Sequence, residues 1–194
     1  MAPDLVTVGG LTVDNVIAAD GRVALAQAGG NGAYSAVGAL VWCDRVGLVS
    51  QAVASYPRDV IARLEGGGVD LSGVIWSEAS LTACSWFIYD PEGRRDEGLQ
   101  STPGDLAAAG FPADRLSPAQ VAGWIAHLRT RSVPGEVGYS QFRVDHPLTP
   151  AQVPAHFLRA RGVHLAPSQP DVVTAMLDLF AHSGMVKIAD PGWQ

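Results

Sequence analysis

Short hydrophobic runs recur along the chain, each bounded by glycine, proline or polar residues. Runs of this length that are rich in Val, Ile, Leu and aromatic residues predict β-strands. We expect strands at residues 5–8, 11–17, 45–50, 74–76, 84–89, 162–166 and 185–189.

Helix start and stop signals lie between several of these runs. Pro57 precedes a helical pattern that ends at the glycines 66–68, because proline suits the first turn and glycine the end of a helix. Further helices are expected at 117–129 and 170–182, and the segments 101–118 and 132–148 are predicted to be irregular. After Asn31, one helical face carries small and apolar residues that suit packing on a sheet: Ala33, Ala36, Val37, Leu40 and Val41.

The last 33 residues contain a strand–helix–strand unit, which predicts two parallel strands joined by a right-handed crossover. Ligands of such sheets lie beyond the carboxyl ends of the strands, here near Ala166, Pro167 and Asp190. Strand 185–189 is expected to be either an edge strand or part of a longer domain. The alternation of strands and helices predicts an α/β protein.

Composition narrows the class of protein. A length of 194 residues with 47% hydrophobic residues suits one folded domain, and a net charge of −6 argues against a nucleic-acid surface. No apolar run reaches the roughly 18 residues of a membrane span, and the N-terminus lacks the pattern of a signal peptide. We therefore expect a cytoplasmic protein with no membrane partner. Cys43 and Cys84 lie in apolar surroundings, as buried reduced thiols do.

The stretch 27–40, QAGGNGAYSAVGAL, is a candidate site for a polar ligand. Gly29 and Gly30 allow close approach to the main chain, and Asn31 is predicted to be the N-cap of the following helix. The alternative is an ordinary strand-to-helix turn that binds nothing. A dinucleotide fingerprint is a weak match. Asp14 is predicted to be either a turn residue that bonds its own backbone or an acceptor for ligand hydroxyls.

Other kinds of chemistry find less support. The five histidines show no spacing typical of metal ligands, so no metal site is predicted, and no Gly-x-Ser-x-Gly elbow of a hydrolase occurs. The hairpin that ends in Arg94 and Arg95 is predicted to be either a flap that reaches an anionic substrate or a solvated β-extension. The tryptophans at 42, 76, 86 and 124 are predicted to pack in the core or lid.

The sequence resembles the ribokinase-like (PfkB) carbohydrate kinases. The resemblance rests on VTVGGLTVDNVI at 6–17, QAGGNGAYSAVGALVW at 27–42, DRVGLVS at 44–50, YPRDVIARLEGGGVDLSGV at 56–74 and YDPEGRRDE at 89–97. It implies a single α/β domain with a mostly parallel sheet flanked by helices and a small β lid, whose strands lie at about 11–28 and 73–100.

The resemblance also implies ATP-dependent phosphorylation of a sugar or related alcohol with Mg²⁺. Asp14 would accept hydrogen bonds from substrate hydroxyls, and Gly29 and Gly30 would offer backbone contacts to the sugar. Asn31 would lie beside the sugar, where the ribokinase branch has lysine. Tyr34 occupies the position of a sugar-binding asparagine in that branch, which argues against ribose.

The chain departs from the family pattern in its catalytic signatures. The Gly-Ala-Gly-Asp loop and the Asn-x-x-Glu motif are absent from the sequence, as is a Walker-type phosphate loop. We therefore expect no catalytic residue in this chain and a substrate-binding portion of the kinase fold whose C-terminal part is missing. The alternative is a non-catalytic sugar-binding or oligomerisation module, with a homodimer formed through lid strands. A dinucleotide-binding oxidoreductase is a third possibility.

Overall fold

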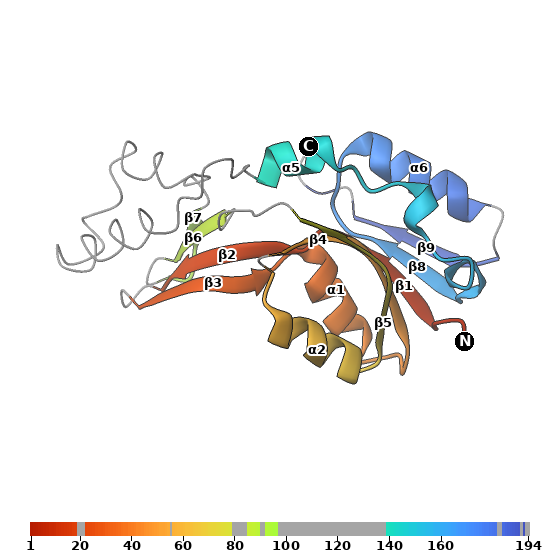
Figure 1. The fold of residues 1–194 in the computed structure, drawn as a ribbon, viewed down its shortest axis with the longest axis horizontal. Coiled ribbons are helices and arrows are strands. Elements are labelled where there is room, and N and C mark those ends of the chain that lie inside the picture. The colour runs from red at the N-terminus through yellow and green to blue at the C-terminus, as the bar shows by residue number, and fades with distance from the viewer. Residues whose placement is uncertain are drawn as a thin grey trace.

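The computed structural model describes residues 1–18, 22–54, 56–78, 85–89, 92–96, 139–181, 184–190 and 192. Its larger sheet has five parallel strands in the order β5-β4-β1-β8-β9 (Figure 1). The strands are β1 (Leu5–Val8), β4 (Val46–Val53), β5 (Val69–Ser77), β8 (Gly162–Leu165) and β9 (Val186–Ala189). The prediction of a mostly parallel α/β core is confirmed, and β9 lies at the edge of the sheet.

A second sheet of four strands, in the order β3-β2-β6-β7, lies to one side of the first (Figure 1). The strands are β2 (Thr12–Ile17), β3 (Val23–Gly29), β6 (Ser85–Tyr89) and β7 (Arg95–Asp96). β2 pairs antiparallel with β3 and parallel with β6. β2, β6 and β7 fall within the ranges expected for the lid, and β3 extends one residue beyond its range, to Gly29. Residues 73–77, also expected in the lid, belong to β5 and pair with β4 in the larger sheet.

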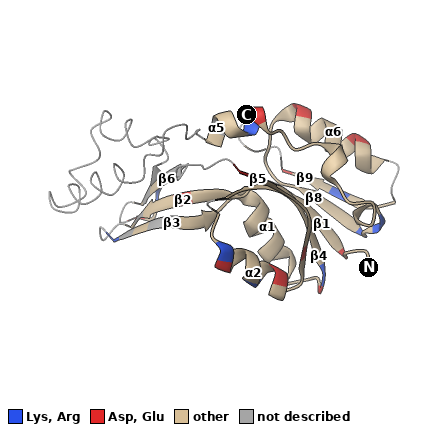
Figure 2. Ribbon diagram, viewed as in Figure 1, with Lys and Arg blue, Asp and Glu red and all other residues tan. Residues whose placement is uncertain are grey.

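Helices cover both faces of the five-stranded sheet, as buried parallel strands require. α1 (Asn31–Ala39) and α2 (Arg58–Gly66) lie on one face, and α6 (Pro170–Ala181) lies on the other, on the same side as α5 (Tyr139–Asp145) (Figure 1). Two short 3₁₀ turns, η1 (Pro150–Gln152) and η2 (Phe157–Arg159), connect α5 to β8. Charged residues occur on α2, α5 and α6 and at strand ends (Figure 2).

The structure corrects three sequence expectations. The buried residues of α1 are Gly32, Ala33, Ala36 and Ala39, so Val37 and Val41, at 53% and 72% exposure, face outward. The small residues let the helix axis approach the sheet closely, and this rotates the larger valines away. α5 forms within the segment 132–148, which was expected to be irregular. The expected helix at 117–129 lies outside the described residues.

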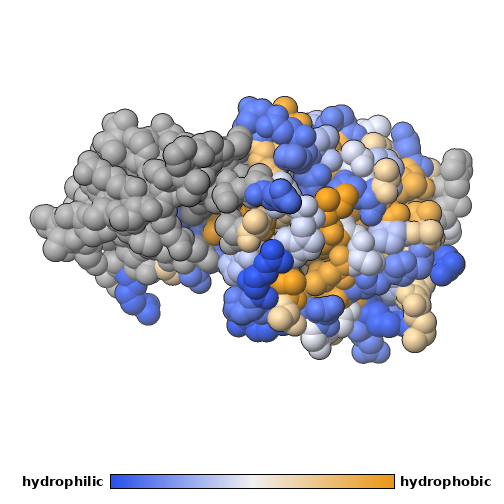
Figure 3. Space-filling model, viewed as in Figure 1, coloured by the Kyte–Doolittle hydropathy of each residue, from blue (hydrophilic) through white to orange (hydrophobic). Residues whose placement is uncertain are grey.

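Trp42 is the third correction, since its side chain is 86% exposed instead of packed. It follows the C-terminal end of α1, next to the exposed Val41. Figure 3 shows hydrophobic residues gathered across the part of the view where α1 and the larger sheet lie. Trp76 is 38% exposed, and the Arg58 guanidinium lies 4.0 Å from the centroid of its ring. Cys43 is a free, partly buried thiol.

Phe157 closes the core over β4 and β5. Its ring is fully buried and lies on two glycines, because a Cβ on Gly47 or Gly73 would come within 2.7 or 3.0 Å of ring atoms. Glycine at these two positions lets the aromatic ring pack directly on the backbone of the sheet. Phe157 and α6 therefore cover the same face of the larger sheet. Met176 and Phe180 of α6 belong to the same apolar cluster as Phe157.

We expect Phe157→Ala to lower the free energy of unfolding by about 3–5 kcal/mol, since it removes a buried aromatic ring and leaves a cavity. Val144→Ala is the control, because Val144 is 59% exposed and its truncation should change stability by less than about 0.5 kcal/mol. Urea denaturation of both variants measures the difference. Equal stability of the two variants would contradict this packing.

A polar contact ties η2 to the edge strand β5. His156 Nε2 lies 2.7 Å from Asp70 Oδ2, and the Ser72 amide donates to Asp70 Oδ1 at 2.9 Å. Desolvation raises the pKa of Asp70, but hydrogen bonds from Ser72 and His156 outweigh it and hold the pKa below the ordinary 3.8.

A carboxyl group whose pKa is lower in the folded state than in the unfolded state stabilises the fold at pH values above its unfolded pKa. This contribution is lost as the pH falls through the pKa of the folded state. Asp70→Asn should therefore destabilise the protein at neutral pH, modestly because the carboxylate is partly exposed. The difference from wild type should shrink below pH 3.8. Unfolding curves of both proteins over a pH series measure the difference in stability. A difference that grows towards acid pH would contradict the lowered pKa of Asp70.

Candidate functional site

Asp14 lies directly against the glycine turn that precedes α1. The pairing of β2 with β3 places Thr12 opposite Gly29 and Asp14 opposite Gln27. The Thr12 hydroxyl donates to Asp14 Oδ1 at 2.9 Å, and a Cβ on Gly29 would overlap Asp14 Oδ2. Asp14 is 5% exposed and lies within a strand, so it is not a turn aspartate. The structure thus brings together the carboxylate and the first glycine of the predicted site.

Gly30 makes the turn itself. Its φ of 101° lies in the left-handed region, and a Cβ there would come within 2.8 Å of the Leu11 Cα. Gly30 is the N-cap of α1, so the prediction that Asn31 caps the helix is wrong. Only glycine adopts this geometry comfortably, and its use at the cap position makes Asn31 the first residue of the helix.

The Asn31 side chain instead joins three segments. Its Oδ1 accepts a hydrogen bond from the Gly10 amide at 2.7 Å, and its Nδ2 donates to the Pro167 carbonyl at 2.7 Å. Gly10 follows β1, and Pro167 follows β8, so the amide ties the glycine turn to the carboxyl ends of two neighbouring strands. The fifth predicted residue, Tyr34, lies one turn along α1 and is 66% exposed.

Tyr56 is a site neighbour that the sequence did not indicate. Its side chain is 1% exposed, and its hydroxyl donates to the Gly29 carbonyl at 3.3 Å. Desolvation raises the pKa of Tyr56, and the nearby Asp14 and Tyr34 raise it further. The phenol therefore stays protonated and holds the carbonyl of the glycine turn in place.

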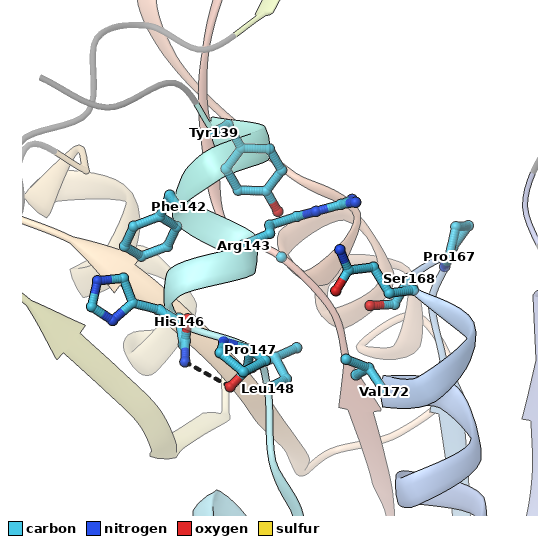
Figure 4. A pocket seen from close by; sticks show the side chains of 12 residues that line it. Tyr139, Phe142, Arg143, His146, Pro147, Leu148, Pro167, Ser168 and Val172 are labelled. Carbon is cyan, nitrogen blue, oxygen red and sulfur yellow. Dashed lines mark hydrogen bonds between the residues drawn. The ribbon is translucent and has the colours of Figure 1, made fainter.

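A pocket lies beyond the carboxyl ends of β1, β4 and β8, where ligands of open α/β sheets bind (Figure 4). About 430 Å³ of empty space lies within the pocket, and this volume includes open solvent. The lining residues are Gly10, Gln51, Tyr139, Phe142, Arg143, His146, Pro147, Leu148, Pro167, Ser168, Gln169 and Val172. None of the five predicted site residues lines it, but Asn31 hydrogen-bonds to Gly10 and Pro167 on its wall. The expected ligand position near Pro167 coincides with this pocket.

The pocket wall combines apolar and polar side chains and carries no described carboxylate. Arg143 and His146 are its ionisable basic residues, and the Gln51 side chain donates to the Pro147 carbonyl at 3.1 Å. The Arg143 guanidinium lies 5.6 Å from the centroid of the Tyr139 ring. A Cβ on Gly10 would overlap the Tyr139 hydroxyl, so α5 packs directly on the loop after β1.

No group of three or more His, Cys, Asp or Glu side chains that could hold a metal ion occurs among the described residues. In the same part of the chain, no helix is long and apolar enough to cross a membrane.

Solved structures show what this arrangement is similar to. A PfkB protein from Polaromonas sp. JS666 matches with a TM-score of 0.58 and 16% identity, over 100% of this chain and 56% of that one. The chain has the ribokinase-like fold. An Escherichia coli protein provisionally named ribokinase II, in complex with ATP and Mg²⁺, matches at 0.54 and 13% identity, over 99% of this chain and 54% of that one.

A protein from Clostridium perfringens, provisionally named a sugar kinase, matches with a TM-score of 0.50 and 12% identity, over 100% of this chain and 52% of that one. The chain thus spans little more than half the length of these structures. No protein-family model and no curated protein matches the sequence. At these identities the similarity establishes the fold alone. It confirms the ribokinase-like fold that the sequence motifs implied.

The Asn31 contacts give a direct test of the site's construction. Asn31→Ala should lower the free energy of unfolding by about 1–3 kcal/mol, because it leaves the Gly10 amide and the Pro167 carbonyl without their partner. Asn31→Asp should cost at least as much, since a carboxylate cannot donate to a carbonyl.

Ser35→Ala is the matched control on the same helix. Its hydroxyl donates only to the Gly32 carbonyl within α1, at 3.1 Å, so its loss should change stability much less. Thermal or urea unfolding compares the three variants. If Asn31→Asp were as stable as wild type, Asn31 would not act as a tie between the two strand ends.

Proposed function

We propose that this chain is the substrate-binding portion of a PfkB-type carbohydrate kinase, an ATP-dependent phosphotransferase that acts on a sugar or related alcohol. The observation that carries the proposal is the buried Asp14 carboxylate against Gly29, in a glycine turn of a ribokinase-like fold that Asn31 ties to two residues of the pocket wall, Gly10 and Pro167. Carboxylate oxygens accept hydrogen bonds from hydroxyl groups, which is the chemistry that a polyol requires.

In this proposal the surrounding residues position the acceptor. Thr12 orients one oxygen of Asp14, and Tyr56 fixes the carbonyl of Gly29. Asn31 keeps the glycine turn at a set distance from the pocket wall. A rigid acceptor loses little conformational freedom when the alcohol binds, so more of the hydrogen-bond energy appears as affinity.

The described residues do not fit the nucleotide and Mg²⁺ that the kinase fold implies. They hold no cluster of acidic or histidine side chains for a metal ion, and the sequence has no phosphate-binding glycine–lysine loop. No described residue is therefore proposed to hold ATP or to take part in phosphoryl transfer.

The second candidate is a non-catalytic sugar-binding or oligomerisation module of the same fold. It is favoured by the second sheet, in which β3 pairs on one side only among the described strands. An open edge of this kind can pair with a second copy and form a homodimer. Analytical ultracentrifugation of the wild type would distinguish this assembly from a monomer.

The test of the main proposal is calorimetric titration with a panel of sugars and polyols, both neutral and anionic. Asp14→Asn should weaken binding about tenfold or more, because a hydrogen bond to a charged acceptor is replaced by a weaker one. Asp44→Asn is the control, since Asp44 is exposed near the opposite end of α1. If no sugar binds, or if Asp14→Asn binds as wild type does, the proposal is wrong.

Thermal shifts separate the proposal from its alternatives. A ligand that binds only the folded state raises the unfolding temperature, and the shift grows with the logarithm of its concentration relative to its dissociation constant. A neutral sugar should stabilise the protein, and ATP with Mg²⁺ alone should not. The largest shift from a nicotinamide dinucleotide would instead favour the oxidoreductase hypothesis.

A further inference from the structure

Arg143 differs from other arginines of the described chain in its surroundings. At the surface, Arg45 pairs with Asp4 at 3.2 Å and Arg63 pairs with Asp59 at 2.8 Å. In the described structure Arg143 has no carboxylate partner, and its Nε is buried without a hydrogen-bond acceptor. An unsatisfied buried donor on a cation is unfavourable, so an acceptor supplied by a bound ligand would stabilise it.

The position of Arg143 points to the pocket as the place of that ligand. Its side chain extends from α5 across the opening, towards the loop that carries Pro167 and Ser168 (Figure 4). The remaining polar groups on this wall include the Ser168 hydroxyl and the Gln169 amide, both of which can donate hydrogen bonds.

The electrostatics of the pocket favour a negative charge. The chain has a net charge of −6, yet no described Asp or Glu lines the pocket, whereas Arg143 and His146 do. Ser168, Gln169 and Val172 also place the N-terminal end of the 12-residue helix α6 at the pocket, and the helix dipole adds positive potential there. Asp171 in that first turn is exposed and does not line the pocket.

Apolar side chains complete the wall and strengthen the effect of the charge. Pro147, Leu148 and Val172 border the same space as Arg143. Apolar walls exclude water and lower the local dielectric, so a charge-assisted hydrogen bond is stronger there than at the surface. A hydroxyl of a neutral sugar can accept from a guanidinium but leaves its charge uncompensated, whereas an oxyanion can accept two parallel hydrogen bonds and pair the charge.

We propose that the pocket binds an anionic group, a carboxylate or phosphate, on the alcohol that this chain recognises, and that Arg143 contacts it. This inference rests on the proposed function and names its substrate class, an acidic or phosphorylated polyol in place of a neutral sugar.

The first experiment uses wild-type protein and four probes: D-glucose, D-gluconate, D-glucose 6-phosphate and inorganic phosphate. Calorimetric titration should show at least one of the two anionic sugar derivatives binding about tenfold or more tightly than glucose. Preference for gluconate identifies a carboxylate site, and preference for the 6-phosphate identifies a phosphate site. Inorganic phosphate should compete only in the second case. Glucose binding as tightly as both anionic derivatives would overturn the inference.

The second experiment uses Arg143→Gln, Arg143→Lys and the control Arg159→Gln, an exposed arginine on η2. Arg143→Gln should abolish the preference for the anionic probe, and Arg143→Lys should retain part of it, because lysine keeps the charge but lacks the planar fork. Arg159→Gln should bind as wild type does. An unchanged preference in Arg143→Gln would overturn the inference. Circular dichroism checks that Arg143→Gln is folded. If it is not, the inference is tested by the wild-type probe series and by Arg143→Lys.

Asp14→Asn separates this inference from the proposed function. Binding of neutral sugars that depends on Asp14 and not on Arg143 would leave the proposed function standing and overturn the anionic site. Binding of the anionic probe that depends on Arg143 and not on Asp14 would support the anionic site and overturn the proposed role of Asp14. If none of the probes binds, both proposals are wrong.

Discussion

The side-chain amide of Asn31 is the contact on which the candidate site depends. It accepts from the Gly10 amide and donates to the Pro167 carbonyl, a residue 136 positions away along the chain. These two bonds hold together the loop after β1, the start of α1 and the loop after β8. They link the glycine turn that holds Asp14 to the wall of the pocket.

Main-chain packing makes this arrangement possible. A Cβ on Gly32 would come within 2.6 Å of the Gly9 carbonyl oxygen, and the Gly32 amide donates to the Gly10 carbonyl at 2.9 Å. The helix therefore begins in direct backbone contact with the loop after β1. Asp14 then occupies the space that a side chain at position 29 would fill. Small residues thus create the room in which a buried carboxylate is held against the glycine turn.

Local sequence signals predicted the parts of the fold that depend on local physics. Pro57 and the glycines after residue 65 delimit α2, and the strand–helix–strand pattern at the end of the chain corresponds to β8, α6 and β9. The family motifs placed Asp14 and Gly29 in one site, and the structure brings them into contact.

The features that were missed depend on contacts between distant segments. The burial of Tyr56 under the glycine turn and the direction of Asn31 follow from tertiary packing, which no spacing along the chain reveals. Val37 and Val41 fit a helical stripe, yet the close approach of α1 at its small residues selects another face for burial. The pocket wall combines α5, α6 and three strand ends, so Arg143 has no local signal that marks it as a site residue.

The most direct test of the account is a crystal structure of the protein with a bound sugar or polyol. The account predicts a ligand hydroxyl within hydrogen-bonding distance of the Asp14 carboxylate, at about 2.5–3.2 Å, next to the Gly29 main chain. The rest of the ligand should extend into the pocket beside Gly10 and Pro167. A ligand bound elsewhere, with Asp14 still covered by protein atoms alone, would contradict it.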